Sequence, residues 1–341
     1  MQCPDCGREM RRLSKFWVCE EHNPPVAIPI RTTPTETVHP YSELCSQLPT
    51  PIAVPIDEFG KWAENKSPML AYRALWAMVD AAELITRFIA IVALFDVRQQ
   101  SGETPEPLRK VLVNVLERPT FGAWRDIAHS AIEKLGTSTL VQELPDFWKQ
   151  HWGPLLEGGS AEQSIIELRN RMAHTARLTD EEAQRLLDAH CERFEKAICA
   201  LNFWASYRLI AVLSDGRAVR LHGVPDPEGW GLPEESNLPT DLSAYRERVV
   251  LLSQDGLGLL VLFPLQLYNP VLVVREGHHE IVDNRPALMV YMRYNRQRQL
   301  LEYTALAPNY AFSQQQFREA FNELFPLSEW RRKLEQQQAA R

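Results

Sequence analysis

The sequence lacks an excess of positive charge. Its 341 residues include 37 Lys and Arg against 44 Asp and Glu, so the net charge is −7 and the pI is near 5.8. A basic field over the whole molecule, of the kind that holds nucleic acid, is therefore excluded. Any site for RNA must be a local patch.

Long apolar runs and leader segments are also missing. The longest apolar run, residues 88–95, is far shorter than the roughly 20 residues that a membrane span needs. The first residues, Gln2, Cys3, Pro4 and Asp5, have the pattern of neither a signal peptide nor a transit peptide. We expect a cytoplasmic protein without a membrane partner.

Several motifs of common enzymes are absent. No Gly-x-x-x-x-Gly-Lys-Ser/Thr loop and no Gly-x-Gly-x-x-Gly after a strand occurs, which argues against ATP hydrolysis and dinucleotide binding. The Gly-x-Ser-x-Gly elbow is missing as well. Cysteine is scarce, with six in total, and we expect the scattered Cys45, Cys191 and Cys199 to be buried, inert thiols.

Four residues near the N-terminus have the spacing of metal ligands. Cys3 and Cys6 are separated by two residues, as are Cys19 and His22, and Gly7 permits the tight turn that such a pair needs. A segment of about 22 residues cannot bury a core, so a metal must supply its folding energy. The segment resembles a short zinc ribbon, in which Zn²⁺ is structural because all four positions are filled by protein. The alternative is four unpaired residues in a flexible tail.

Proline dominates the next segment, residues 23–57. Because proline fixes φ and removes a donor, we expect no long helix here, and we interpret residues 23–65 as an extended linker with a strand-like piece at 26–30. The alternative to a linker is a proline-rich recognition motif.

Apolar residues at helical spacing follow from residue 68 to about 213. We expect helices over 69–98, 107–116 and 121–135, a helical or irregular piece over 140–156, and an amphipathic stretch over 167–213. Thr179 with Glu182 has the form of a capping box. The pattern predicts an up-and-down bundle of about five helices over residues 66–211.

Period-two alternation replaces the helical pattern after residue 214. It predicts hairpins over 249–263 and 288–304, strand-like pieces at 267–274 and 279–282, and a closing helix over 312–338. The predicted fold class is therefore α+β and multidomain. It comprises a zinc ribbon (1–22), the linker (23–65), an all-α bundle (66–211) and a β-rich domain with a terminal helix (212–341).

The hexapeptide 169–174 carries the groups that RNA cleavage without a metal requires. His174 can transfer protons near neutral pH, Arg169 can grip two phosphate oxygens, and Asn170 can bind phosphate or orient the imidazole. If the motif lies at a helix start, the helix N-terminus adds partial positive charge beside the phosphate. Arg171 adds local positive charge.

The bare spacing is weak, because it occurs three times: Arg169/His174, Arg185/His190 and Arg217/His222. Only the first has an amide directly after the Arg and an expected helix start. The alternative is a solvated helical face on which Arg169 pairs with Glu167 or Asp180.

Several other polar and aromatic residues are expected to have no catalytic or ligand-binding role. His278-His279-Glu280 could be half a metal site, but a turn with solvated histidines fits the spacing better. Four aromatic residues of the bundle are expected to pack in the core rather than stack on bases: Trp148, Trp152, Trp204 and Tyr207.

Residues 168–174, Leu-Arg-Asn-Arg-Met-Ala-His, within an all-helical segment resemble the motif of the HEPN superfamily, and the likeness covers residues 66–211. The resemblance implies a metal-independent endoribonuclease that leaves a 2′,3′-cyclic phosphate and a 5′-hydroxyl. It also implies a homodimer in which two copies of the motif form one composite site. Arg169, Asn170 and His174 are the implied catalytic residues, and Glu83 or Asp80 could orient Arg169.

Many HEPN ribonucleases act as toxins or effectors in prokaryotic toxin–antitoxin and antiviral defence systems. The resemblance thus implies an RNA substrate and a regulatory protein partner or antitoxin. Some HEPN domains are not catalytic. The alternative function is an adaptor that dimerises through the bundle and binds a protein or nucleic-acid partner through the ribbon and the β region.

Overall fold

The structure is a computed structural model of the 341-residue chain. It describes residues 2, 6, 8–9, 11–13, 16–19, 26–29, 39–63, 68–136, 139–174, 178–225, 234–235, 238, 240–269, 272–276, 279–283, 287–295, 297–306 and 312–339. Within these residues the fold is mixed α+β, as expected.

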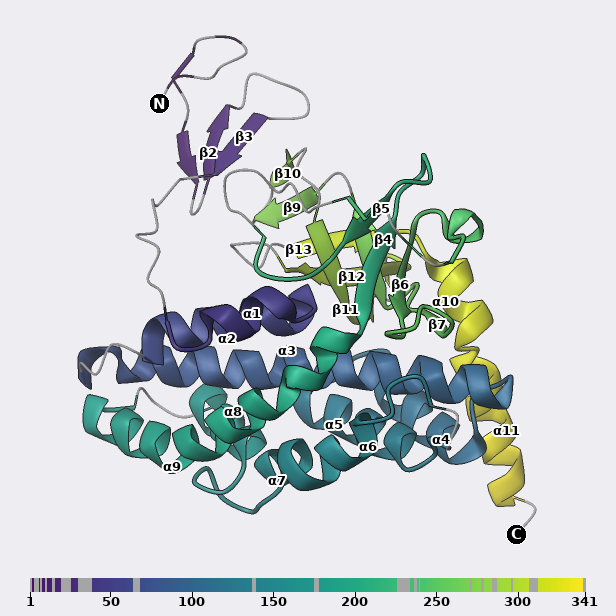
Figure 1. Ribbon diagram of the computed structural model, residues 1–341, viewed down its shortest axis with the longest axis horizontal. Helices are drawn as coiled ribbons and strands as arrows, with labels where there is room; N and C mark the ends of the chain where they lie inside the picture. Colours follow the sequence, from purple (N-terminus) through teal and green to yellow (C-terminus); the bar gives the residue numbers. More distant parts are fainter. Residues whose placement is uncertain are drawn as a thin grey trace.

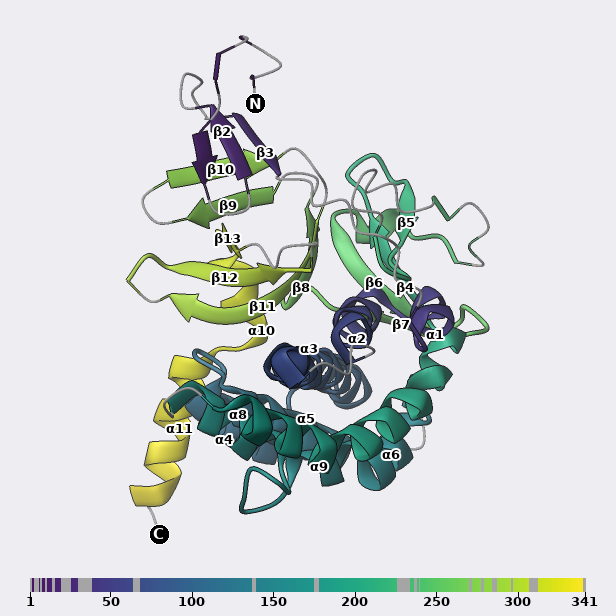
Figure 2. The same cartoon turned by 90° about the vertical axis from the view of Figure 1, so that its left-hand side faces the viewer.

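A long central helix, α3 (Pro68–Ser101), organises the molecule. Residues 84–97 are all buried, and apolar residues such as Ile85 and Val92 lie on all sides there, as a helix segment without a solvent face requires. Figure 2 shows α3 almost end-on, with α2 and the sheets on one side and α5, α8 and α9 on the other. The expected helix over 69–98 is confirmed.

Shorter helices complete the lower layer in Figure 1. Two expected ones are confirmed as α4 (Glu106–Val115) and α5 (Phe121–Ile132). The stretch 140–156 forms α6 (Leu144–Phe147), a π-helical turn (Trp148–Trp152) and α7 (Gly153–Leu156). None of the described helices has the length and apolarity that a membrane span requires.

The expectation of no long helix over 23–57 is wrong at its C-terminal end. Helix α1 (Ser42–Gln47) and the 14-residue helix α2 (Thr50–Ala63) form there. Pro51 lies in the first turn, where no amide donor is needed, so only Pro55 removes a hydrogen bond. The apolar face of α2 is buried against α3, which outweighs that loss.

Helix α9 (Asp180–Cys199) begins as predicted, because the Thr179 hydroxyl accepts a hydrogen bond from the Glu182 amide at 3.2 Å. The helical expectation beyond residue 206 is wrong. After a 3₁₀ segment (Ala200–Ser206), residues Arg208–Val212 form strand β4, which pairs with a strand of the predicted β region.

Two antiparallel four-stranded sheets are described. The first has the order β5-β4-β6-β7, with β5 (Ala218–Arg220), β6 (Arg248–Leu252) and β7 (Leu259–Val261). The second has the order β13-β12-β11-β8, with β8 (Gln266–Asn269), β11 (Ala287–Asn295), β12 (Leu300–Ala305) and β13 (Phe312–Gln315). Both predicted hairpins are confirmed, as β6–β7 and β11–β12.

A five-stranded sheet joins strands from the N-terminal segment to strands of the β region. Its order is β1-β2-β3-β10-β9, with β1 (Arg11–Leu13), β2 (Phe16–Cys19), β3 (Val26–Pro29), β9 (Leu272–Glu276) and β10 (His279–Asp283). Strand β3 confirms the strand-like piece at 26–30 and pairs in parallel with β10. The ribbon segment is thus built onto the β region (Figure 1).

The predicted closing helix over 312–338 is interrupted. Residues 312–315 form β13, and helices α10 (Arg318–Leu324) and α11 (Leu327–Ala339) follow. The break lies at Phe325, which has φ −130° and ψ 75°, because a residue before proline avoids the helical region.

The helices and the sheets share one apolar core. The Tyr291 ring lies edge-on to Trp124 at 6.3 Å between centroids, and its hydroxyl donates to the Leu116 carbonyl at 2.8 Å. The predicted bundle and β region are therefore held together by continuous packing across α3, α5 and β11.

Candidate functional site

The motif occupies the second half of helix α8 (Ile165–His174), not its start. The Ser164 hydroxyl caps the helix by accepting from the Glu167 amide at 3.4 Å, so Arg169 is already one turn inside and His174 is the last helical residue. The expected contribution of a helix N-terminus to phosphate binding is therefore wrong for this motif, since the partial charge at a C-terminal end is negative.

Helix α8 presents the motif outward. Leu168 and Met172 are buried in the core and fix the rotation of the helix. Arg169 and Asn170 are half-buried, and His174 is exposed. A ligand can reach all three polar side chains.

Arg169 faces the central helix. Its Nε lies 3.8 Å from Glu83 Oε2, and its side chain is 37% exposed. Of the partners considered, the structure thus brings Glu83 to Arg169, rather than Glu167 or Asp180. A pair this long and this exposed contributes little stability. The guanidinium is therefore oriented by Glu83 without being tightly held.

Glu83 itself is held in place by a buried arginine, Arg87. Its Oε1 accepts from Arg87 Nη2 at 2.9 Å, and Arg87 is only 5% exposed, with its guanidinium 5.7 Å from the Trp124 ring centroid. One carboxylate therefore links a buried arginine to the arginine of the motif.

We expect Glu83→Gln to lower the free energy of unfolding by about 3 kcal/mol, because it leaves the buried Arg87 charge without a counter-ion. Urea unfolding measures this. Glu167→Gln, on the motif helix, is the matched control and should change stability by less than about 0.5 kcal/mol. Adding Arg87→Met to Glu83→Gln should restore most of the loss. A Glu83→Gln protein as stable as wild type would contradict the anchoring.

Asp80, one turn before Glu83, also belongs to this cluster. Desolvation, followed by the charges of Glu83 and Glu58, raises the pKa of Asp80 to about 6, and Arg169 opposes the rise. Asp80 is thus a group that titrates near neutral pH beside the motif.

Arg171 is engaged differently from Arg169. Its Nη2 pairs closely with Glu182 at the start of α9, and its Nη1 lies 3.9 Å from Glu162. The ion pair between Arg171 and Glu182 thus joins α8 to α9, and this is the electrostatic role that Arg171 has in the structure. The capping box is consequently half made, because Glu182 binds Arg171.

The other two Arg-to-His spacings are structural. His190 is fully buried, and its Nε2 lies 2.6 Å from the Ala161 carbonyl oxygen. His222 is buried as well, accepting from the Leu209 amide at 3.1 Å and donating to the Gln47 carbonyl at 3.0 Å. Of the three histidines, His174 alone is exposed to solvent.

The structure describes two of the four predicted zinc ligands. Cys6 Sγ and Cys19 Sγ lie 3.6 Å apart, close to the roughly 3.8 Å between two thiolates of a tetrahedral Zn–S site. Cys3 and His22 lie outside the described residues. Accordingly, no group of three or more metal-ligating side chains occurs within the described part of the chain.

Several smaller predictions have clear outcomes. All four aromatic residues expected in the core are buried: Trp148, Trp152, Trp204 and Tyr207. Cys45 is buried as expected, but Cys191 is half-buried and Cys199, the last residue of α9, is exposed. His279 and Glu280 belong to strand β10 and not to a turn, while His278 lies outside the described residues.

Sequence reasoning missed a group of aromatic side chains near the motif. Trp62 of α2 and Tyr72 and Trp76 of α3 are only half-buried. Their signal was available, because Tyr72, Trp76, Asp80 and Glu83 recur every three or four residues and so share one face of α3.

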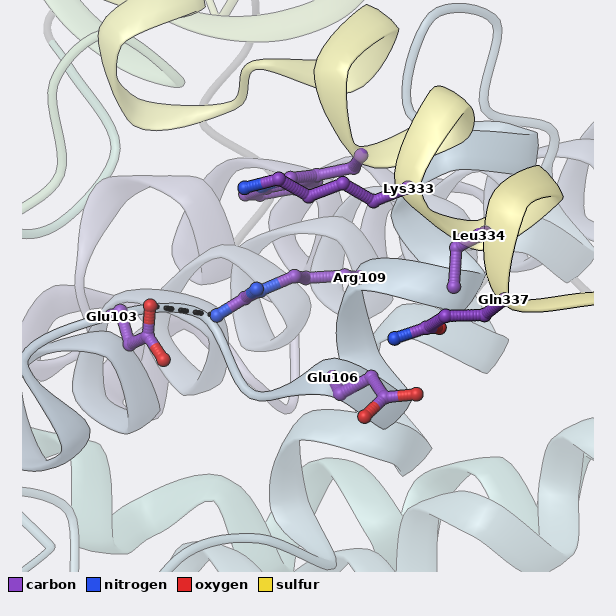
Figure 3. A pocket seen from close by; sticks show the side chains of 7 residues that line it. Glu103, Glu106, Arg109, Lys333, Leu334 and Gln337 are labelled. Carbon is purple, nitrogen blue, oxygen red and sulfur yellow. Dashed lines mark ion pairs between the residues drawn. The ribbon is translucent and has the colours of Figure 1, made fainter. Parts of the chain in front are cut away.

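A pocket of about 220 Å³ lies elsewhere, between α11, α4 and the loop before α4 (Figure 3). Its lining residues are Glu103, Glu106, Arg109, Trp330, Lys333, Leu334 and Gln337. Arg109 pairs with Glu103 at 2.7 Å, Lys333 with Glu329 at 2.6 Å, and Glu106 with Lys110 at 2.9 Å. Each of these charges is thus met by a neighbour on its own helix or in the loop before α4.

Comparisons with known proteins found no matching family model and no matching curated protein or solved structure.

Proposed function

We propose that the protein is a metal-independent endoribonuclease of HEPN type whose active site contains Arg169, Asn170 and His174. The observation that supports this most is the contrast among the three Arg-to-His spacings. His190 and His222 are buried and hydrogen-bonded to the backbone, whereas His174 is exposed at the end of the helix that carries Arg169, whose guanidinium is oriented but weakly held.

These residues suit the chemistry of RNA cleavage. An imidazole takes the proton of the 2′-hydroxyl or protonates the leaving 5′-oxygen, and the Arg169 fork offsets the charge that gathers on the phosphate in the transition state. Asn170 adds a hydrogen-bond donor beside them. One His174 supplies one proton-transfer group, so a dimer that places two motifs face to face supplies both the acid and the base.

The biological setting that we propose is a cytoplasmic effector or toxin of a prokaryotic defence system, held in check by a protein partner or antitoxin. The direct test is whether wild-type protein cleaves single-stranded RNA and loses that activity when His174 is replaced.

One observation favours the alternative of a non-catalytic adaptor. Arg169 already has a carboxylate neighbour, and Arg171 is used between α8 and α9. The motif could then serve only to orient the helices. Correctly folded protein that binds RNA or a second copy without cleaving RNA would decide for the adaptor.

We also propose that Cys3, Cys6, Cys19 and His22 hold one structural zinc ion. The 3.6 Å separation of the Cys6 and Cys19 sulfurs supports this, as does their convergence from the two sides of the β1–β2 hairpin. A bound zinc would fix a segment too short to bury its own core.

We expect Cys19→Ser to reduce bound zinc from one ion per chain to almost none, because a tetrahedral site loses one of its four ligands. Elemental analysis of protein from zinc-supplemented cultures measures this. Cys199→Ser, which changes an exposed cysteine of α9, should keep its zinc. Wild-type protein without zinc, or equal loss in both variants, would contradict the site.

A further inference from the structure

Three half-buried aromatic side chains form a patch on helices α2 and α3. The Tyr72 and Trp76 rings meet edge-on with centroids 6.4 Å apart, and the Arg73 guanidinium lies 5.1 Å from the Trp62 ring centroid. All three rings pack on the core with one part and leave the rest at the surface. We refer to Trp62, Tyr72, Arg73 and Trp76 as the aromatic patch.

The aromatic patch adjoins the motif. Trp76 precedes Asp80 by one helical turn, the charge of Asp80 interacts with that of Arg169, and Glu83 lies 3.8 Å from Arg169. The seven residues from Trp76 to Glu83 correspond to about 10 Å along α3, or roughly three nucleotides of a stacked strand. Helix α8 lies against the N-terminal half of α3, the half that carries the patch (Figure 1).

One acidic group near the aromatic patch is offset by arginines. Glu83 lies between Arg87 and Arg169, at 2.9 Å and 3.8 Å. Arg73 is exposed and contributes a positive charge within the patch. An anionic strand therefore meets the Arg73 charge at the patch and a Glu83 carboxylate that two arginines offset.

The composition of the aromatic patch favours nucleic acid over a second copy of the chain. The buried centre of a protein–protein interface is depleted in aspartate, but here the exposed Asp80 lies one helical turn from Trp76. Half-exposed aromatic rings interleaved with arginine are the usual platform for unpaired bases, since every base has a π-face.

We propose that Trp76 and Tyr72 stack on the bases of single-stranded RNA next to the motif, with Arg73 on the adjacent backbone phosphate. This inference rests on the proposed function, for which it names the substrate class. Bases within a duplex are not free to stack on protein side chains, so the substrate is unpaired RNA. Because stacking tolerates any base, sequence preference is weak.

The test uses the full chain with His174→Ala, so that RNA is bound and not cut, and a short fluorescein-labelled single-stranded RNA. Fluorescence anisotropy gives the dissociation constant. Trp76→Leu keeps an apolar side chain without a π-face and should weaken binding between about 5-fold and 100-fold. Trp76→Phe keeps a ring and should bind nearly as well as the parent. Tyr245→Ala, a half-buried aromatic of the β region, is the control and should bind like the parent.

Equal binding by the Trp76→Leu and parent proteins would overturn the inference, as would the absence of RNA binding by the parent. Sedimentation distinguishes the other occupant, because a Trp76→Leu protein that loses dimerisation along with binding would assign the patch to a second copy. The two proposals fail separately. RNA cleavage that Trp76→Leu leaves unchanged contradicts the stacking subsite alone, and patch-dependent binding without cleavage by wild type contradicts the nuclease alone.

Discussion

His174→Ala is expected to lower the rate of RNA cleavage by at least about 100-fold, because general acid–base catalysis by a positioned histidine contributes about 10² to 10⁴. His174 is exposed at the end of α8 and makes no hydrogen bond within the described part of the chain, so its removal should change stability by less than about 0.5 kcal/mol. Initial rates on a labelled single-stranded RNA, together with thermal unfolding, measure the two effects.

The matched control is His129→Ala. His129 is exposed on α5 with its Nε2 3.4 Å from Glu133 Oε1, outside the motif. Its replacement should leave cleavage unchanged. If both variants cleave as fast as wild type, the activity does not depend on the motif. If both lose activity equally, the loss is not specific to His174.

Replacing His222, the histidine of another Arg-to-His spacing, should have the opposite effect: large on stability and small on cleavage. His222→Ala leaves the Leu209 amide and the Gln47 carbonyl without their partner in a buried site, which costs about 2–4 kcal/mol. Urea unfolding at pH 8 measures the loss. A variant as stable as wild type would show that the bridge between strand β4 and the end of α1 contributes nothing.

His222 also predicts a pH dependence. Burial, followed by the charge of Arg220, lowers its pKa to about 4 in the folded chain. In the unfolded chain the pKa is about 6.5, so between these values the unfolded state binds more protons. The contribution of neutral His222 to the free energy of unfolding is therefore complete above about pH 6.5 and is lost as the pH falls toward 4. The difference between the two pKa values makes this contribution about 3 kcal/mol.

The variant isolates this contribution. Burial also lowers the pKa of His190, so His190 too lowers the free energy of unfolding as the pH falls. Because His190 is present in both proteins, its effect cancels in the comparison. Stability curves of wild type and His222→Ala should therefore converge as the pH falls from about 6.5 to 4. Parallel curves over this range would contradict the buried, neutral state of His222.

Local patterns predicted much of the fold. The apolar residues of α3 and the hairpins β6–β7 and β11–β12 depend on contacts between near neighbours, and all are confirmed. Helix α2 was missed because Pro55 argues against a helix, while the burial that outweighs it comes from α3. The pairing of β3 with β10 joins residues about 250 positions apart, and no local pattern signals it.

The candidate site was predicted in part. Its residues were identified, but the expected helical stretch began at residue 167, whereas α8 begins at Ile165 and is capped by Ser164. Glu83 was one of four carboxylates named as partners of Arg169, and it is the one whose oxygen lies 3.8 Å from the Arg169 Nε. The spacing of Tyr72 and Trp76 on one face of α3 could be seen in the sequence, but the approach of Trp62 on α2 to Arg73 on α3 is revealed only by the tertiary structure.

The most direct test of the central claim is the chemistry of the RNA ends. Wild-type protein should cleave single-stranded RNA in buffer without added divalent metal, leaving a 2′,3′-cyclic phosphate and a 5′-hydroxyl, and His174→Ala should produce neither. The cyclic phosphate is identified by mass spectrometry and by the failure of the 3′ end to ligate before phosphatase treatment. Products with a 5′-phosphate and a 3′-hydroxyl, or no cleavage by wild type either alone or freed from its partner, would contradict it.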